Sequence, residues 1–122
     1  MKSYSDNKQE TFQPTGNNYQ TYYRWNHKQV TIQAQECDRL QWECDEVLVP
    51  YVSYETTVQV VINELWNNDV EKKLINDFAA ANLGIYTGNE ATLMINNYKQ
   101  FLNDRKTIKE IVRTDCNDNG IR

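Results

Sequence analysis

The sequence predicts an α+β protein, with a small N-terminal antiparallel β-meander followed by three helices. Two observations lead to this prediction. Apolar and aromatic residues alternate with polar ones through residues 19–52, which is typical of half-buried strands. From Ser53 onward the apolar spacing changes to three and four residues, which is typical of helices that bury one face.

Residues 19–52 are predicted to form three or four short strands. Aromatic residues alternate with polar ones from Tyr19 to Trp25, and the segment 26–28 is expected to turn the chain. A second turn is expected at residues 45–46. Pro50 should end the last strand, because proline cannot donate a hydrogen bond to a sheet. A sheet this small needs a helix or a second protein against its apolar face.

The first helix is predicted over residues 55–66, with Ser53 as its N-cap. A run of β-branched residues between Val58 and Ile62 lowers its helix propensity. Trp66 is expected to close the junction between helices, because a tryptophan at a helix end buries a large apolar surface.

The second and third helices are predicted to form an antiparallel helical hairpin. The second runs over residues 69–83, capped by Asn68, with Glu71 completing a capping box. Gly84 follows at the position where a left-handed C-cap is expected. The third helix runs over residues 90–114, and the short loop before it makes the two helices antiparallel neighbours.

These elements divide the chain into an arm, one domain and a tail. Residues 1–18 are polar and are expected to be a flexible arm that orders on a neighbouring protein. Residues 19–114 are expected to be a single domain, β-rich over 19–52 and helical over 53–114. Residues 115–122 are expected to fray as a C-terminal tail.

The composition argues against two classes of partner. The chain has 122 residues and a net charge of -4, so it lacks the basic surface that non-specific nucleic-acid binding requires. No run approaches the roughly 18 apolar residues that span a bilayer, and no apolar leader is visible. We therefore expect neither nucleic acid nor membrane as a partner.

The cysteines do not form a recognisable metal or redox motif. They are Cys37, Cys44 and Cys116, and an odd number without an apolar leader is typical of reduced thiols in a cytosolic protein. Cys37 and Cys44 do not have the C-x-x-C spacing of zinc and redox sites. We expect no metal and no cofactor.

The sequence also shows no catalytic constellation. His27 is the only histidine, and its predicted place in a turn favours a surface residue over the base of a nucleophilic triad. The acidic residues Glu43, Asp45 and Glu46 are expected to solvate a turn rather than to form a general acid–base pair. No glycine-rich phosphate-binding loop is present. We expect that the protein is not an enzyme.

Apolar and aromatic residues in two regions are candidates for protein contact: Tyr22, Tyr23, Trp25, Trp42, Ile108, Ile111 and Val112. The aromatic ones are explained best as a sheet core with tyrosines at its rim, and alternatively as a protein-binding surface. Nucleic-acid stacking on the same sheet lacks nearby basic residues, and carbohydrate stacking is a further alternative.

The last predicted helix is longer than its hairpin mate. Its apolar stripe spans about six turns and that of the preceding helix about four. The apolar residues near its C-terminal end therefore pack on the first helix, on the sheet or on another copy of the protein. From the last possibility we expect a homo-oligomer.

The helical half resembles a group of small phage and prophage proteins of Bacteroides-type gut bacteria, including crAss-like phages. Five stretches carry the resemblance: Val61–Trp66, Glu71–Ile85, Tyr98–Lys106, Ile108–Lys109 and Asp115–Cys116. It covers roughly residues 46–121, and the strands before them match loosely. The resemblance implies a viral structural context, such as a capsid, head-fibre or tail-fibre component, and it transfers no site residues.

We therefore expect a non-enzymatic phage virion structural protein, assembled in the host cytoplasm. It would act as a head-fibre, capsid-decoration or tail-fibre-associated component through contacts with other phage structural proteins. One alternative is a fibre or tail assembly chaperone that is absent from the mature particle. Another is a small phage inhibitor of a host enzyme, for which the net charge of -4 is modest.

Overall fold

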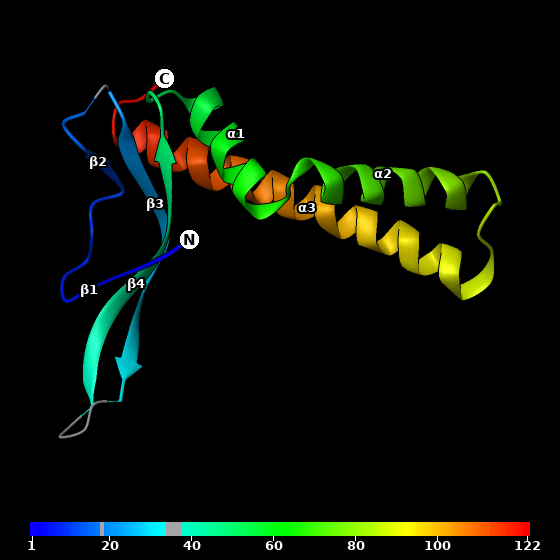
Figure 1. The fold of residues 1–122 in the computed structure, drawn as a ribbon, viewed down its shortest axis with the longest axis horizontal. Coiled ribbons are helices and arrows are strands. Elements are labelled where there is room, and N and C mark those ends of the chain that lie inside the picture. The colour runs from blue at the N-terminus through cyan, green and yellow to red at the C-terminus, as the bar shows by residue number, and fades with distance from the viewer. Residues whose placement is uncertain (18, 34–37) are drawn as a thin grey trace. The chain divides into compact units, whose positions relative to one another are not determined.

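The structure is a computed structural model that describes residues 1–17, 19–33 and 38–122. A four-stranded antiparallel sheet precedes three helices (Figure 1), which confirms the predicted α+β class. The elements are β1 (Lys2–Ser5), β2 (Phe12–Pro14), β3 (Thr21–Ile32), β4 (Arg39–Val49), α1 (Tyr54–Leu65), α2 (Asn68–Asn82) and α3 (Gly88–Asp118).

The sheet is built around one long hairpin, with strand order β1-β4-β3-β2. β3 and β4 have 12 and 11 residues and pair from Thr21 opposite Val49 to Ile32 opposite Arg39. β2, β3 and β4 form a meander, and β1 adds to the outer edge of β4. The hairpin therefore replaces the several short strands that the alternation predicted.

The N-terminal residues form two edge strands, which corrects the predicted flexible arm over residues 1–18. β1 pairs with β4 from Lys2 opposite Asp45 onward, and β2 pairs with β3 from Phe12 opposite Tyr23 onward. Edge strands are held by backbone hydrogen bonds to a partner strand. Such pairing does not need an apolar sequence, so the polar composition did not reveal it. Asn18 lies outside the described residues.

Residues 6–11 connect β1 at one edge of the sheet to β2 at the other, and we call this segment the strap. Arg24 N donates a hydrogen bond to Thr11 O at 2.8 Å. Gln9 Oε1 accepts hydrogen bonds from Ser3 Oγ at 2.9 Å and from Cys44 Sγ at 3.4 Å. The strap thus covers the sheet face that carries Arg24 and Cys44.

The predicted turn at residues 26–28 is a β-bulge within β3. The pairing register shifts between Trp25 and Lys28, and Asn26 has a φ of 58°. Asparagine adopts this left-handed conformation more readily than most residues, so the same local signal fits a turn or a bulge. The other predicted turn, at residues 45–46, lies inside β4.

The N-caps of the first two helices follow the predicted chemistry, with one shift of position. Thr56 N donates to Ser53 Oγ at 3.1 Å, which confirms the first cap. In α2 the cap is Asn67 instead of Asn68, because Asn67 Oδ1 accepts from Val70 N at 2.9 Å. Two adjacent asparagines offer the same capping chemistry, and the backbone conformation selects the first of them.

The C-terminal end of α2 confirms the predicted glycine cap. Gly84 has a φ of 77°. Ile85 N donates to Ala80 O at 3.0 Å and Gly84 N donates to Ala81 O at 3.2 Å. These two hydrogen bonds form a Schellman motif.

The last residues are also ordered by hydrogen bonds, which corrects the predicted tail over residues 115–122. α3 continues to Asp118, and Ile121 N donates to Cys116 O at 2.8 Å. Arg122 O accepts a hydrogen bond from Tyr54 N at 3.0 Å.

The chain divides into two compact units, and both boundaries fall within helices. The sheet unit comprises residues 1–60 and 111–122, and the hairpin unit comprises residues 61–110. The single domain predicted over residues 19–114 stays a prediction.

The sheet unit has its core on the face opposite the strap. Its buried apolar residues include Tyr23, Trp25, Val47, Val49, Val58, Val112 and Cys116. The Tyr23 hydroxyl donates to Asp115 Oδ2 at 2.6 Å, so the end of α3 lies against β3. The end of α3 therefore covers the apolar face of the sheet, which a sheet of this size needs for its stability.

The hairpin unit contains aromatic contacts between α3 and the residues that precede it. Phe78 of α2 stacks on Tyr98 of α3 at a ring-centroid distance of 4.6 Å. Trp66 packs edge-on against the buried Phe101 at 5.2 Å. The tryptophan therefore closes the junction between helices, as predicted.

Candidate functional site

Three of the seven predicted contact residues lie in the core. Tyr23, Trp25 and Val112 are 0%, 5% and 1% exposed. Tyr23 stacks on Trp25 with ring centroids 5.4 Å apart. In this fold these residues cannot contact a partner, so the sheet-core alternative describes the aromatic pair.

Tyr22 and Trp42 are half-buried, and each has a cation over its ring. The Arg24 guanidinium lies 5.1 Å from the centroid of Tyr22, and Lys8 Nζ lies 5.8 Å from that of Trp42. Contacts of this kind contribute about 0.5–1 kcal/mol when exposed. They leave only part of each aromatic surface available to a partner.

The end of α3 is covered within the chain, which is among the three arrangements predicted for it. Residues 111–122 belong to the sheet unit, where Val112 and Cys116 are buried. Ile108 is half-buried and Ile111 is exposed. Of the three predicted aliphatic contact residues, Ile111 alone therefore presents an open surface.

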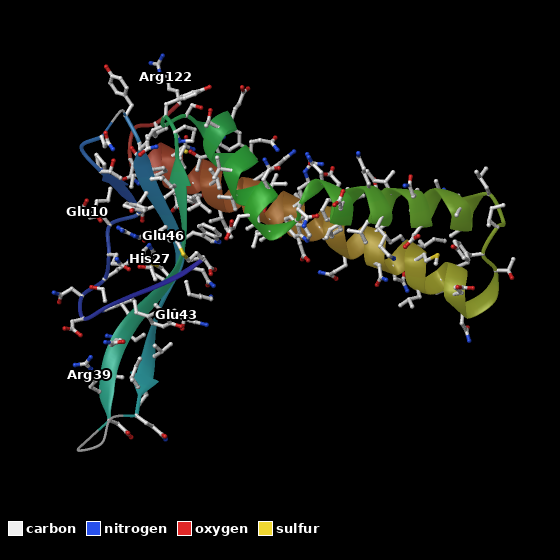
Figure 2. The ribbon with its side chains drawn as sticks, in the orientation of Figure 1. Glu10, His27, Arg39, Glu43, Glu46 and Arg122 are labelled. Carbon is white, nitrogen blue, oxygen red and sulfur yellow. The ribbon has the colours of Figure 1, made fainter. Side chains whose placement is uncertain are left out.

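A buried ion pair lies beneath the strap. Arg24 Nε donates to Glu46 Oε2 at 2.7 Å, and both residues are buried. The guanidinium also donates to Gln13 Oε1 and to Glu10 O. Figure 2 shows Glu46 and Glu10 in this part of the sheet unit. These partners satisfy the buried hydrogen-bonding groups of Arg24 and Glu46. Since Glu10 belongs to the strap, the pair holds the strap on the sheet.

His27 is partly buried within the bulge. Its Nε2 lies 3.4 Å from Thr11 Oγ1, near the long limit for a hydrogen bond. Burial lowers its pKa below the usual value, and the charge of Lys8 lowers it further. Among the described residues no carboxylate hydrogen-bonds to its ring, so it has no such partner in the role of the triad aspartate.

The two described cysteines are buried free thiols. Burial raises the pKa of both Cys44 and Cys116, which keeps them in the unreactive thiol form at neutral pH. Cys37 lies outside the described residues. Within the described ranges, no group of three or more His, Cys, Asp or Glu residues is placed to hold a metal ion. Across the described helices, no stretch combines the length and hydrophobicity of a transmembrane span.

The hairpin unit exposes three large apolar side chains at one end. Leu83, Ile85 and Leu93 are 79%, 73% and 60% exposed, and we call them the hairpin tip. Leu83 and Ile85 flank the Gly84 cap in the loop between α2 and α3, and Leu93 lies within the first two turns of α3. A group of exposed apolar residues is typical of an interaction site.

The sequence around Gly84 contains a signal for the hairpin tip. A loop between helices is usually polar, whereas here leucine and isoleucine stand on either side of the capping glycine. The cap explains part of this pattern, because a Schellman motif often includes an apolar residue after the glycine. It does not explain why both side chains are exposed.

A second exposed surface lies on the outer ribbon, which comprises residues 28–32 of β3 and 39–41 of β4. Here the two strands pair only with each other among the described residues, because β1 and β2 end before this region. The β-hairpin of β3 and β4 extends beyond β1 (Figure 1), with Arg39 near its end (Figure 2). Lys28 and the adjacent bulge are features that discourage edge-to-edge pairing.

Leu83, Ile85 and Leu93 of the hairpin tip are therefore candidate contact residues of the hairpin unit. Comparisons with protein-family models, with curated proteins and with solved structures find no match to this chain.

Proposed function

We propose that this protein is a non-enzymatic assembly protein and a structural component of a phage virion. The observation that supports protein binding is the exposure of Leu83, Ile85 and Leu93 at one end of the helical hairpin. The virion setting is supported by the resemblance of residues 46–121 to phage and prophage proteins. The candidate positions are head-fibre, capsid-decoration and tail-fibre-associated, with other phage structural proteins as partners.

The hairpin tip is suited to binding because it is both apolar and held in place. Fully burying one leucine or isoleucine side chain is worth roughly 1.5–3 kcal/mol. The backbone on both sides of Gly84 is held by the Schellman hydrogen bonds from Gly84 N and Ile85 N. A preformed loop loses less conformational entropy on binding than a mobile one.

We further propose that the hairpin takes part in self-association. α2 contains no fully buried residue, because its only described hairpin partner is one face of α3. A second hairpin packed against the first would complete a four-helix arrangement and bury the side chains that are now half-exposed. Closed two-fold contacts of this kind are the commonest form of homo-oligomer.

Sedimentation equilibrium over a concentration series tests the self-association. The test variant combines Val70→Ser and Ile75→Ser on α2, where these residues are 44% and 41% exposed, and the control is Leu40→Ser on the outer ribbon, where Leu40 is 61% exposed. We expect the natural protein and the control to exceed the monomer mass and the test variant to remain monomeric. A natural protein that stays monomeric throughout would contradict self-association.

The virion setting is tested by mass spectrometry of purified particles from a strain that carries the gene. We expect peptides of this protein at a fixed ratio to the major capsid protein. If the protein occurs in the lysate but not in the particles, the assembly-chaperone alternative is favoured. Capture of a host enzyme together with absence from particles would favour the inhibitor alternative.

A further inference from the structure

The sheet unit contains a cleft that the proposed function does not use. It has a volume of about 780 Å³ and lies between the β2–β3 turn and the segment after β4. Pro14, Asn17 and Gln20 contribute from the turn region, and Tyr51 and Val52 from the segment after β4. The volume falls within the range of pockets that bind small ligands.

Two exposed tyrosines line this cleft. Tyr19 and Tyr51 are 89% and 60% exposed, and among the described residues neither ring stacks on another aromatic ring. Their faces are therefore open to a ligand. An aromatic ring with an open face offers a large, rigid apolar platform with a polar hydroxyl at its edge.

Tyr19 is held in a conformation that a bulky residue rarely adopts. Its φ is 63°, in the left-handed region. Strain of this kind is worth about 1–3 kcal/mol and tends to occur at functional sites. Burial does not compensate for it here, because the ring is exposed. Binding of a ligand would give the strained position a function.

The turn that carries Tyr19 is held by its own hydrogen bonds. Thr15 N donates to Gln20 O at 3.0 Å, and Gln20 N donates to Asn17 O at 3.0 Å. Thr15 Oγ1 also donates to Gln20 O at 3.1 Å. The cleft wall is therefore formed before any ligand arrives, which lowers the entropy lost on binding.

The polar groups of the cleft indicate the chemistry of the ligand. The side-chain amides of Asn17 and Gln20 make no hydrogen bond to another described residue, and each amide offers both donors and an acceptor. A ligand hydroxyl also donates and accepts, so it can pair with either group. No charged side chain is among the described residues that line the cleft, which favours a neutral ligand.

From these features we infer that the cleft binds a neutral oligosaccharide. The weakly positive C–H groups of a sugar ring match the negative face of a tyrosine, and the sugar hydroxyls match the two amides. A proline-rich peptide also binds aromatic grooves. Its prolines have no backbone N–H to donate, so it would leave the amide acceptors unused. This inference goes beyond the proposed function and does not depend on it.

The test is an NMR titration of the full-length, ¹⁵N-labelled protein with four uncharged trisaccharides, built from glucose, galactose, mannose and N-acetylglucosamine. We expect at least one to cause saturable shifts of the amide signals of Gln20, Thr21, Tyr51 and Val52. Tyr19→Ala and Tyr51→Ala should each weaken binding about tenfold, as expected when one aromatic contact is lost. Tyr4→Ala is the matched control, because Tyr4 is 53% exposed and does not line the cleft.

Three results would overturn the inference. One is that none of the four trisaccharides causes saturable shifts at the cleft. Another is that decaproline shifts the same signals at a lower concentration than any of the sugars does. The third is that Tyr4→Ala weakens sugar binding as much as the cleft variants do. For each variant, an amide spectrum with the same chemical-shift dispersion as that of the natural protein verifies that the fold is retained.

Discussion

The Tyr23 hydroxyl donates a hydrogen bond to Asp115 Oδ2 at 2.6 Å, across 92 positions of the chain. It links the fully buried ring of Tyr23 in β3 to the last turns of α3 within the sheet unit. Burial raises the pKa of the Tyr23 hydroxyl, and the bond to Asp115 raises it further. The tyrosine is therefore a neutral donor to a carboxylate.

Removing this hydrogen bond should destabilise the protein. Tyr23→Phe keeps the ring and deletes the donor, and a hydrogen bond to a charged group contributes about 1.5–3 kcal/mol. We expect the free energy of unfolding, measured in urea, to fall by that amount. Tyr22→Phe is the control, because the Tyr22 hydroxyl has no hydrogen-bond partner among the described residues. Equal losses in the two variants would show that the Asp115 contact contributes little.

The raised pKa of the Tyr23 hydroxyl predicts a loss of stability at high pH. The pKa of Tyr23 is higher in the folded state than its ordinary value of 10.0, so above that pH the unfolded state loses its proton first. The stability that Tyr23 contributes is present below pH 10 and decreases as the pH rises further. The unfolding free energy of the natural protein should fall between pH 10 and 11 by up to about 1.4 kcal/mol more than that of Tyr23→Phe. Parallel pH profiles of the two proteins would rule this out.

The buried pair of Arg24 and Glu46 should be sensitive to the loss of one partner. Arg24→Met leaves a buried carboxylate without its cation, and such a change costs about 3–5 kcal/mol. The double variant Arg24→Met with Glu46→Leu should recover most of that loss, because no uncompensated charge remains. Chemical denaturation of both variants gives the comparison. A double variant no more stable than the single one would mean that packing, not charge, explains the loss.

Arg24 of this pair also holds the N-terminal residues on the sheet. The Arg24 guanidinium donates to Gln13 Oε1 and Glu10 O, so Arg24→Met should loosen the strap and β2. We expect amide hydrogen exchange over residues 9–14 to accelerate more than exchange in α2, which belongs to the hairpin unit. Uniform acceleration throughout the chain would indicate general destabilisation instead.

His27 should titrate below its ordinary range. Burial lowers its pKa, and the positive charge of Lys8 lowers it further. As the only histidine in the chain, it gives a single imidazole signal in a proton NMR titration, and we expect a midpoint below 6.5. Lys8→Gln should raise the midpoint part of the way back, whereas Lys72→Gln in α2 should leave it unchanged. A midpoint at or above 6.5 would contradict the buried environment.

The lowered pKa also has a consequence for stability. Because the folded state holds the His27 proton less tightly than the unfolded state does, the contribution of this residue is present above pH 6.5. It is lost as the pH falls through the folded-state pKa. His27→Gln should therefore reduce the difference in unfolding free energy between pH 7 and pH 5, and an unchanged difference would contradict the predicted shift.

The sequence was sufficient for features that depend on neighbouring residues. Ser53 as an N-cap and Gly84 as a left-handed C-cap follow from backbone geometry within one turn of helix. The helical hairpin follows from apolar spacing and a short loop, both of which can be read along the chain. The same reasoning placed the α2 cap one residue late, because Asn67 and Asn68 are chemically alike.

The candidate sites could be predicted only in part. The sequence singled out Tyr23, Trp25 and Val112 because they are large and apolar, but such residues form cores and interfaces alike. Exposure separates the two roles, and exposure depends on which elements pack together. The same limit applies to the tyrosine cleft, where Tyr19 and Tyr51 become neighbours only because β4 returns beside the β2–β3 turn.

By itself the sequence determined the α+β class, the two caps and the hairpin of α2 and α3, because these depend on interactions within a few residues. The tertiary structure decided the rest. It made residues 2–5 and 12–14 the edges of a sheet, it turned the residue 26–28 segment into a bulge, and it buried the end of α3 beside Tyr23. Each of these depends on pairing or packing between residues far apart in the chain, for which a local pattern carries no signal.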